Sequence, residues 1–320
     1  MDRPRYRPLD LSGVKTTPLA SRPSKVGVGD FARPGEVGLS FSSFLNNLPD
    51  QWQARDFKAV VQAIVAAQGS GRPVIWGMGA HVIKGGLSPL VIRAAEKATA
   101  TALAINGAGA IHDVEIALVG QTSEDVEAGL GEGSFGMAEE TGRFIHEAAA
   151  EAARSGVGLG FALGKKLLTS QAPFVNYSIL AQGYRLGIPV TVHVALGTDI
   201  VHMHPKARGG DLGEASLYDF RLFAAVVADL EGGVYLNVGS AVILPEVFLK
   251  ALSLARNLGY HVEDFTTVNL DLYQHYRPTQ NVVRRPTAQG GQGYALTGPH
   301  ELLLPLLFQA ITEALEAKDG

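Results

Sequence analysis

Four short apolar runs, each followed closely by glycine, most constrain how this chain can fold. They are PVIWGMGA (73–80), ATALAINGAGA (100–110), IPVTVHVAL (188–196) and VYLNVGSAVIL (234–244). Such runs are typical of buried parallel strands that enter loops. Stretches with helical spacing separate them, and strands that alternate with helices favour a doubly wound parallel sheet. We therefore predict an α/β, Rossmann-like fold with a mainly parallel sheet, to which DFTTVNLDL (264–272) adds another strand.

The chain divides into an arm and one domain. Residues 1–35 are rich in Pro, Arg and Gly and show no sustained period, which predicts an extended arm of the kind that often reaches a neighbouring subunit. Residues 36–320 carry the repeating pattern. With 46% hydrophobic and 18% charged residues, the chain can bury a core of ordinary size.

Composition excludes several classes of function. The net charge is -4 and the basic residues are scattered, so we expect no nucleic-acid partner. No apolar run is long enough to span a membrane and the first residues lack a signal-peptide core, so we expect no membrane partner and a cytoplasmic location. Cysteine is absent, which excludes thiolate ligands and cysteine nucleophiles.

Glycine and polar residues gather where the predicted strands end. In a parallel sheet these ends share one edge, and ligands bind beyond it. Glycines there let backbone amides approach a phosphate. GEGSFG (131–136) matches a dinucleotide motif by letter but follows a helical stretch, so we interpret it as a loop. The residues predicted to contact a cofactor are Gly77, Gly79, Asn106, Gly107, Gly109, Asp199, Gly239 and Ser240.

Histidines follow three of these strands, and their chemistry leaves several roles open. His202 and His204 lie two positions apart, so on an extended backbone both could bind one ion, such as zinc. Imidazoles also serve as acid and base, or cap loops structurally. The predicted metal ligands are His81, His112, Asp199, His202 and His204.

In order and spacing, these segments resemble deoxyhypusine synthase over most of the chain. FSSFLNNLPDQWQARDFKAVVQAI is similar to the early helices of that family, and INGAGAIHDVEIAL to a strand end with paired acids. ILAQGYRLGIPVTVHVALGTD, GSAVILPEVFLKALSLARNLG and ELLLPLLFQAI follow in the same order. The resemblance implies the α/β fold, NAD as cofactor and a homotetramer. It also implies that Asp199 keeps the place of an aspartate in a family loop.

Departures from the family pattern argue against deoxyhypusine synthesis. Tyr294 aligns with the lysine that forms an imine in the family, and without an amine no imine forms. Glu246 falls near the position of the family's catalytic histidine. His112 and His204 fall near positions where the family has acids that bind spermidine. The family's Ser-Asn pair becomes Ala80-His81, and its terminal Ala-Asp falls at Gly298-Pro299.

Three hypotheses follow. The leading one is an NAD-linked or metal-assisted enzyme acting on another small-molecule ligand. A second is a non-catalytic nucleotide-binding or scaffold protein. The third is a polyamine-linked aminobutyl transferase in which another lysine, such as Lys250, replaces the lost one. For the first, the predicted catalytic residues are His112, Asp113, His204 and Glu246.

Overall fold

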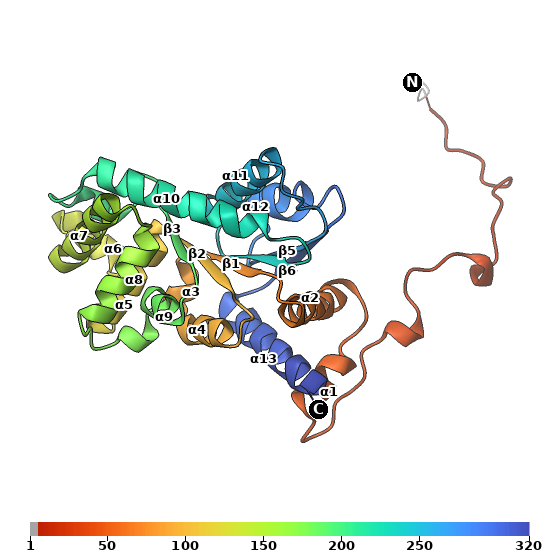
Figure 1. Cartoon of the computed structure of the whole chain (residues 1–320). Helices are drawn as coiled ribbons and strands as arrows, with labels where there is room; N and C mark the ends of the chain where they lie inside the picture. The colour runs from red at the N-terminus through yellow and green to blue at the C-terminus, as the bar shows by residue number, and fades with distance from the viewer. Residues whose placement is uncertain (1–5, 320) are drawn as a thin grey trace.

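Six parallel strands form a single sheet in the order β3-β2-β1-β4-β5-β6. The computed structural model describes residues 6–319, and the side chains through residue 317. The parallel α/β fold predicted from the apolar runs is confirmed (Figure 1). The strands are β1 (Val74–Met78), β2 (Ala102–Asn106), β3 (Val190–His193), β4 (Val234–Val238), β5 (Thr266–Asp271) and β6 (Gln292–Thr297).

Two differences from the sequence prediction concern strand boundaries. The run at 234–244 is a strand only to Val238, because helix α11 (Ile243–Asn257) begins within it and the Ser240 hydroxyl accepts a hydrogen bond from Leu244 N at 3.1 Å. Strand β6 lies outside the apolar runs from which the strands were predicted. It is an edge strand with most residues exposed or half-buried, so it lacks the apolar run that identified the others.

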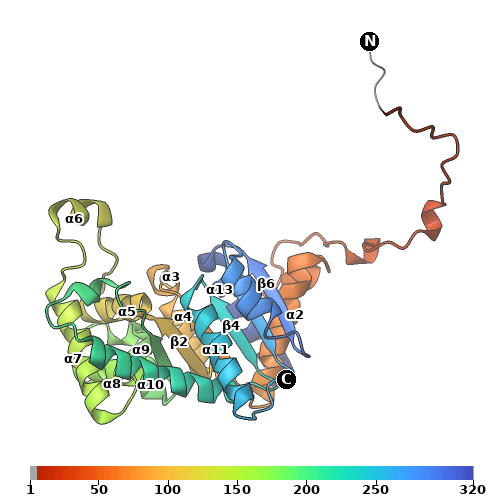
Figure 2. The same cartoon turned by 90° about the horizontal axis from the view of Figure 1, so that it is seen from above.

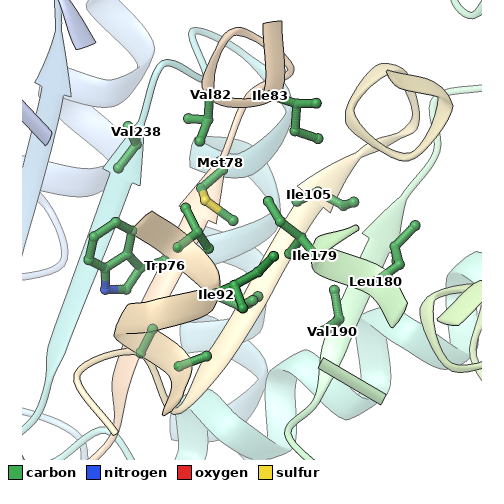
Figure 3. Packing of buried hydrophobic residues seen from close by; sticks show 14 of the residues in the cluster. Trp76, Met78, Val82, Ile83, Ile92, Ile105, Ile179, Leu180, Val190 and Val238 are labelled. Carbon is green, nitrogen blue, oxygen red and sulfur yellow. The ribbon is translucent and has the colours of Figure 1, made fainter. Parts of the chain in front are cut away.

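Helices cover both faces of the sheet (Figure 1). Alternate residues of each strand point to opposite faces, so Trp76 and Met78 face one core cluster while Ile75 and Tyr235 face the other. Figure 3 shows the larger cluster, where strand side chains meet Ile92 from α4 and residues at the start of α9. Packed with this cluster are α2 (Trp52–Gly69), α4 (Ser88–Glu96), α5 (Gly107–Val119), α7 (Glu139–Ser155), α8 (Leu159–Thr169), α9 (Ile179–Leu186) and α13 (His300–Asp319).

The other face is covered by α10 (Gly209–Ala228) and α11, with α12 (Tyr276–Pro278) and the π-helical turn η5 (Thr279–Arg284) beside them. The remaining elements are short: η1 (Leu19–Ser21), η2 (Val28–Asp30), α1 (Phe41–Asn47), α3 (His81–Lys84), α6 (Val126–Glu132), η3 (Val175–Tyr177) and η4 (Ile200–Met203). Helix α6 stands away from the body beside α5 and α7 (Figure 2). Within residues 6–319, no helix has both the length and the apolar character needed to cross a membrane.

The buried carboxylate of Asp219 joins three elements at one edge of the sheet. On α10, its Oδ2 accepts hydrogen bonds from Val192 N in β3 and Gly160 N in α8, both at 2.9 Å. Burial raises the pKa of Asp219 to about 7, although these backbone N–H groups act in the opposite direction. The folded protein therefore holds Asp219 protonated at a pH where the unfolded chain ionises it.

We predict that Asp219→Asn flattens the pH dependence of stability. Because the folded pKa lies above the ordinary aspartate pKa of 3.8, Asp219 stabilises the folded protein below about pH 4, and this contribution is lost as the pH rises towards 7. One such proton changes the free energy of unfolding by up to ~1.4 kcal/mol per pH unit. Urea unfolding at several pH values between 4 and 7 measures the slope. Asp229→Asn, at the exposed end of α10, is the matched control; equal slopes in wild type and Asp219→Asn would contradict the prediction.

Candidate functional site

The loops after β1 and β4 meet at the centre of the sheet's carboxyl edge. Gly79 N donates to the Val238 carbonyl at 2.9 Å, and a side chain on Gly79 would overlap the carbonyl of Gly239. The strand order reverses here, since β2 and β3 lie on one side of β1 while β4, β5 and β6 lie on the other. In open α/β sheets such a reversal is the usual ligand crevice.

Glycines at this edge make room for neighbouring protein groups. A side chain on Gly77 would overlap the buried ring of Tyr235, and one on Gly107 would overlap the Asp199 carboxylate. Gly239 has a φ of +65°, and its added Cβ would lie 2.8 Å from Cε1 of His300. The sequence predicted that these glycines leave space for a cofactor. At all three positions the space is taken by the protein itself, because packing demands small residues there.

The N-terminus of α5, predicted to hold a phosphate, holds a carboxylate of the chain itself. Asn106 caps this helix, and its side chain accepts a hydrogen bond from Gly109 N at 2.9 Å. The Asp199 carboxylate lies against Gly107 in the first turn. An anion is stabilised at a helix N-terminus, which is also where a phosphate would bind. Burial raises the pKa of Asp199, and the neighbouring His202 acts in the opposite direction.

His202 is fixed by the loop that carries it. Its Nδ1 accepts hydrogen bonds from Gly197 N and Asp199 N, both at 3.1 Å. Nδ1 therefore carries no proton, and in the neutral ring the proton lies on Nε2. That Nε2 is buried and has no hydrogen-bond partner among the described residues. His202 thus supports the loop through one nitrogen and keeps an unused donor on the other.

His204 has both ring nitrogens engaged. Nε2 lies 3.1 Å from Oε2 of Glu139, and Nδ1 accepts a hydrogen bond from Lys206 N at 3.1 Å. The ring stacks on His146 of α7 with centroids 5.8 Å apart, in a space that Gly142 leaves open. Burial lowers the pKa of His146, whose Nε2 donates to the Val201 carbonyl at 2.7 Å. This arrangement attaches the loop after β3 to α7.

The predicted metal ligands are not gathered around one point. His81 lies beside His300, with ring centroids 6.3 Å apart, whereas His112 and His204 each contact a different glutamate. Across residues 6–317, no group of three or more His, Asp or Glu side chains is positioned to hold a metal ion. His202 lies in the 3-10 turn η4 and not on an extended backbone, so its spacing of two from His204 did not produce a shared site.

His112 belongs to a hydrogen-bonded group with Thr122 and Glu115. Its Nδ1 lies 2.6 Å from the Thr122 hydroxyl, which also donates to the Glu115 carboxylate. Thr141 donates to the other oxygen of Glu115 at 3.2 Å. Burial acts to raise the pKa of Glu115, but hydrogen bonding by His112, Thr122 and Thr141 outweighs it, so the pKa lies below the ordinary value. Glu115 is therefore an ionised acceptor.

These proton positions leave one nitrogen of His112 available. An ionised Glu115 can only accept hydrogen bonds, so the Thr122 hydroxyl donates one to it. That hydroxyl in turn accepts a hydrogen bond from Nδ1–H of His112. Nε2 of His112 then carries a lone pair, and no described residue donates to it. The carboxylate and hydroxyl on one side thus fix the orientation of the ring and leave Nε2 as the nitrogen that can accept a proton.

An open cavity of about 810 Å³ lies beside this group, between α5, α7 and the segment that leads to α6. Glu115 and Thr122 form part of its wall. The lining residues are Glu115, Leu118, Val119, Gln121, Thr122, Ser123, Glu124, Ala138, Glu140, Thr141, Arg143, Phe144 and Glu147. The cavity has the size of a small-molecule site and places a polarised hydroxyl against its contents.

Two predicted catalytic residues have structural partners. The buried carboxylate of Asp113 accepts hydrogen bonds from the Ser178 hydroxyl and from Ile179 N and Leu180 N, and so fixes the start of α9. Burial raises its pKa to about 6, against the effect of these bonds. Glu246 is ion-paired with Lys250, which lowers its pKa, and also with Arg277. This differs from the expected role of either residue as a base or as a partner of a histidine.

Sequence reasoning missed several polar residues that the fold brings into contact with one another. His300, the first residue of α13, is buried and lies against Gly239. Its Nε2 lies 3.2 Å from the Leu270 carbonyl and 3.8 Å from the Asp271 carboxylate. Thr122 and Glu115 were also missed, since neither follows a strand. A histidine spaced three residues before a glutamate on a helix was the available signal for His112 and Glu115.

Comparisons with known proteins show similarity of fold without similarity of sequence. No protein-family model matches the chain, and no curated protein sequence does. Among solved structures, the complex of AgrE with ornithine and NAD+ superposes with a TM-score of 0.53 at 15% identity, covering 82% of this chain and 33% of AgrE. The chain thus spans about a third of the length of AgrE.

Two further structures match a larger share of their own length. A LOR/SDH protein from Methanococcus maripaludis S2 has a TM-score of 0.50 at 16% identity, covering 83% of this chain and 71% of its own. A protein described as a deoxyhypusine synthase from Entamoeba histolytica has a TM-score of 0.50 at 11% identity, covering 87% and 95%. At these identities the likeness concerns the fold alone: a Rossmann-like α/β domain that this chain has in common with a deoxyhypusine synthase-like protein and with part of an NAD-bound one.

Proposed function

We propose that the chain is an enzyme that transfers a proton to or from a small ligand bound in the cavity lined by Glu115 and Thr122. The observation that carries this proposal is the Glu115–Thr122–His112 group: Glu115 and Thr122 line the cavity, and His112 contacts the Thr122 hydroxyl. A packing role alone does not require a half-buried carboxylate, a hydroxyl and an imidazole in series beside an open cavity. Groups with tuned basicity in a cleft are typical of catalytic sites.

The charge of the cavity wall favours a positively charged ligand. Four glutamates line it against a single arginine, Arg143. One of the four, Glu147, is already neutralised by Lys166 and Lys206. The remaining three give an excess of negative charge, which attracts an ammonium or guanidinium group. The family resemblance implied that acids which bind spermidine are lost near His112 and His204. The cavity wall nevertheless carries acidic residues, mainly from α5 and α7.

Each residue of the group has a distinct part in the proposed proton transfer. Glu115 stays ionised and accepts a hydrogen bond from the Thr122 hydroxyl, which fixes the direction of that hydroxyl. The Thr122 hydroxyl accepts a hydrogen bond from Nδ1–H of His112, so Nε2 remains free to accept a proton. When His112 becomes an imidazolium, the adjacent carboxylate stabilises its charge. The ligand's leaving proton and the returning one both pass through Nε2.

A second candidate function, NAD binding at the reversal point between β1 and β4, is favoured by the strand order and by the NAD+ bound to AgrE. The predicted phosphate seat does not fit this cofactor, because Asp199 fills it with negative charge. His81, which is exposed beside His300, remains as a contact for a dinucleotide, whereas Ser240 is buried and its hydroxyl already accepts a hydrogen bond from Leu244 N. We therefore assign no step of the proposed proton transfer to NAD.

The first prediction concerns ligand binding. We expect L-ornithine or L-arginine, the amino acids bound in AgrE crystals, to bind this chain, and Glu115→Gln to weaken the affinity at least ~10-fold because one carboxylate of the wall is lost. Isothermal titration calorimetry measures the affinity, and spermidine extends the series. Glu151→Gln, on the same helix as Glu147 but outside this cavity, is the control. Failure of every cation to bind the wild type would contradict the proposed ligand class.

The second prediction concerns proton transfer. With a bound amino acid in D2O, we expect loss of the carbon-bound α-proton signal by NMR. His112→Ala should slow this exchange by ~10² or more. Thr122→Ser should retain most of the rate, whereas Thr122→Val should lose it, because only serine preserves the hydroxyl between Glu115 and His112. If the amino acid binds but the exchange rate is the same in His112→Ala as in the wild type, the result would instead support a non-catalytic binding protein.

The third prediction concerns NAD. If the dinucleotide binds at the reversal point, calorimetry should detect NAD+ binding that His81→Ala weakens. Asp229→Ala, which lies just before the opposite, amino-terminal edge of β4, should leave it unchanged. Asp199→Asn should strengthen NAD+ binding only if phosphate also reaches α5, since it removes the competing charge. An absence of NAD+ binding in the wild type and in Asp199→Asn would exclude this candidate.

A further inference from the structure

The N-terminal arm, defined here as residues 6–40, carries apolar side chains that its own chain leaves uncovered. Every residue of the arm is exposed except Asp30, which is half-buried. Leu9, Leu19, Val28 and Val37 have relative exposures between 72% and 108%. Segments that stay unstructured are poor in such residues, and repeated exposure of large apolar side chains marks a site of association.

The arm and the rest of the chain have opposite charge. Residues 6–40 contain five Lys or Arg and three Asp or Glu, whereas residues 41–320 contain 20 Lys or Arg and 27 Asp or Glu. The arm is therefore net positive, and the remainder, taken alone, is more negative than the whole chain. This division favours contact between the arm and the surface of a folded domain of the same kind.

The base of the arm is fixed, and its course leads away from the body. Arg33 N donates to the Asn47 carbonyl at 2.9 Å, and Asp50 N donates to the Asp30 carbonyl at 3.0 Å, so the arm is tied to the segment around α1. Beyond these bonds it extends away from the sheet and its helices (Figures 1 and 2). A fixed base with an outward course presents the arm to another molecule.

The arm is long enough to cross a neighbouring subunit. At roughly 3.3 Å per extended residue, the 25 residues from Tyr6 to Asp30 can span about 80 Å. A folded domain of roughly 280 residues has a radius of gyration of only about 19 Å. Pro8, Pro18 and Pro23, and the local turn in which Gly27 N donates to Asp30 at 2.8 Å, limit the conformational freedom of the arm.

We propose that the arm is an intersubunit strap that lies on the acidic surface of a second copy of this chain. A second copy supplies both the complementary charge and an arm of its own, so two copies can exchange arms symmetrically. The arm's apolar side chains are then buried in the assembly. The homotetramer expected from the family resemblance is one assembly that such straps can hold together.

The first experiment tests whether association depends on the apolar side chains of the arm. In sedimentation velocity over a range of concentrations, the wild type should have a mass of at least two chains of 33.8 kDa each. Val28→Asp should raise the dissociation constant at least ~10-fold, whereas Thr17→Asp, which adds the same charge to an exposed polar position, should have a smaller effect. A monomeric wild type, or an unchanged dissociation constant in Val28→Asp, overturns the proposal.

The second experiment tests which molecule the arm contacts. Because the sequence contains no cysteine, Val28→Cys provides a single attachment point for a photoactivated cross-linker. Normal and nitrogen-15-labelled copies are mixed, exchanged and irradiated, and the linked peptides are identified by mass spectrometry. Peptides that join the two isotopic forms support the strap. Links found only within one isotopic form show that the arm folds back on its own body, which overturns it.

Discussion

The Asp219 carboxylate secures the crossover on which the architecture of the sheet depends. Helix α10 takes the chain from β3, at one edge, to β4 beside β1 at the centre, and Asp219 ties this helix to β3 and α8. The crossover creates the reversal of strand order. It also turns the chain from one face of the sheet to the other, so α10 and α11 bury the face that α4 and α5 leave uncovered.

The sequence predicted the elements whose burial is uniform and failed where burial is mixed. Strands β1 to β5 coincide with apolar runs because both faces of a parallel sheet are covered. Strand β6 is an edge strand that is largely exposed, so its residues show no such run. The end of β4 was placed too late because Ile243 and Leu244, which continue its apolar pattern, pack as the first turn of α11.

The candidate site was less predictable, because a residue type does not specify which neighbour will use it. A glycine at position 107 is compatible with a phosphate-binding site and also with a close contact to Asp199. Which of the two forms depends on the folded loop after β3. Histidines at three strand ends indicated one shared site, but a loop that turns back on α7 gives His204 partners of its own. Glu115 and Thr122 are seven residues apart, and their contact requires the turn after α5.

Helix α5 shows how adjacent residues acquire opposite roles. Successive side chains on a helix diverge by about 100°, so Asp113 faces the core while His112 faces the side where Glu115 and Thr122 lie. The buried Asp113 fixes α9 against α5 and so limits movement of the helix. Glu115 lies one helical turn after His112 and therefore stays beside the His112 ring. Asp113 thereby gives its neighbour His112 a rigid support, which the proposed base needs if its free nitrogen is to stay aligned with a ligand.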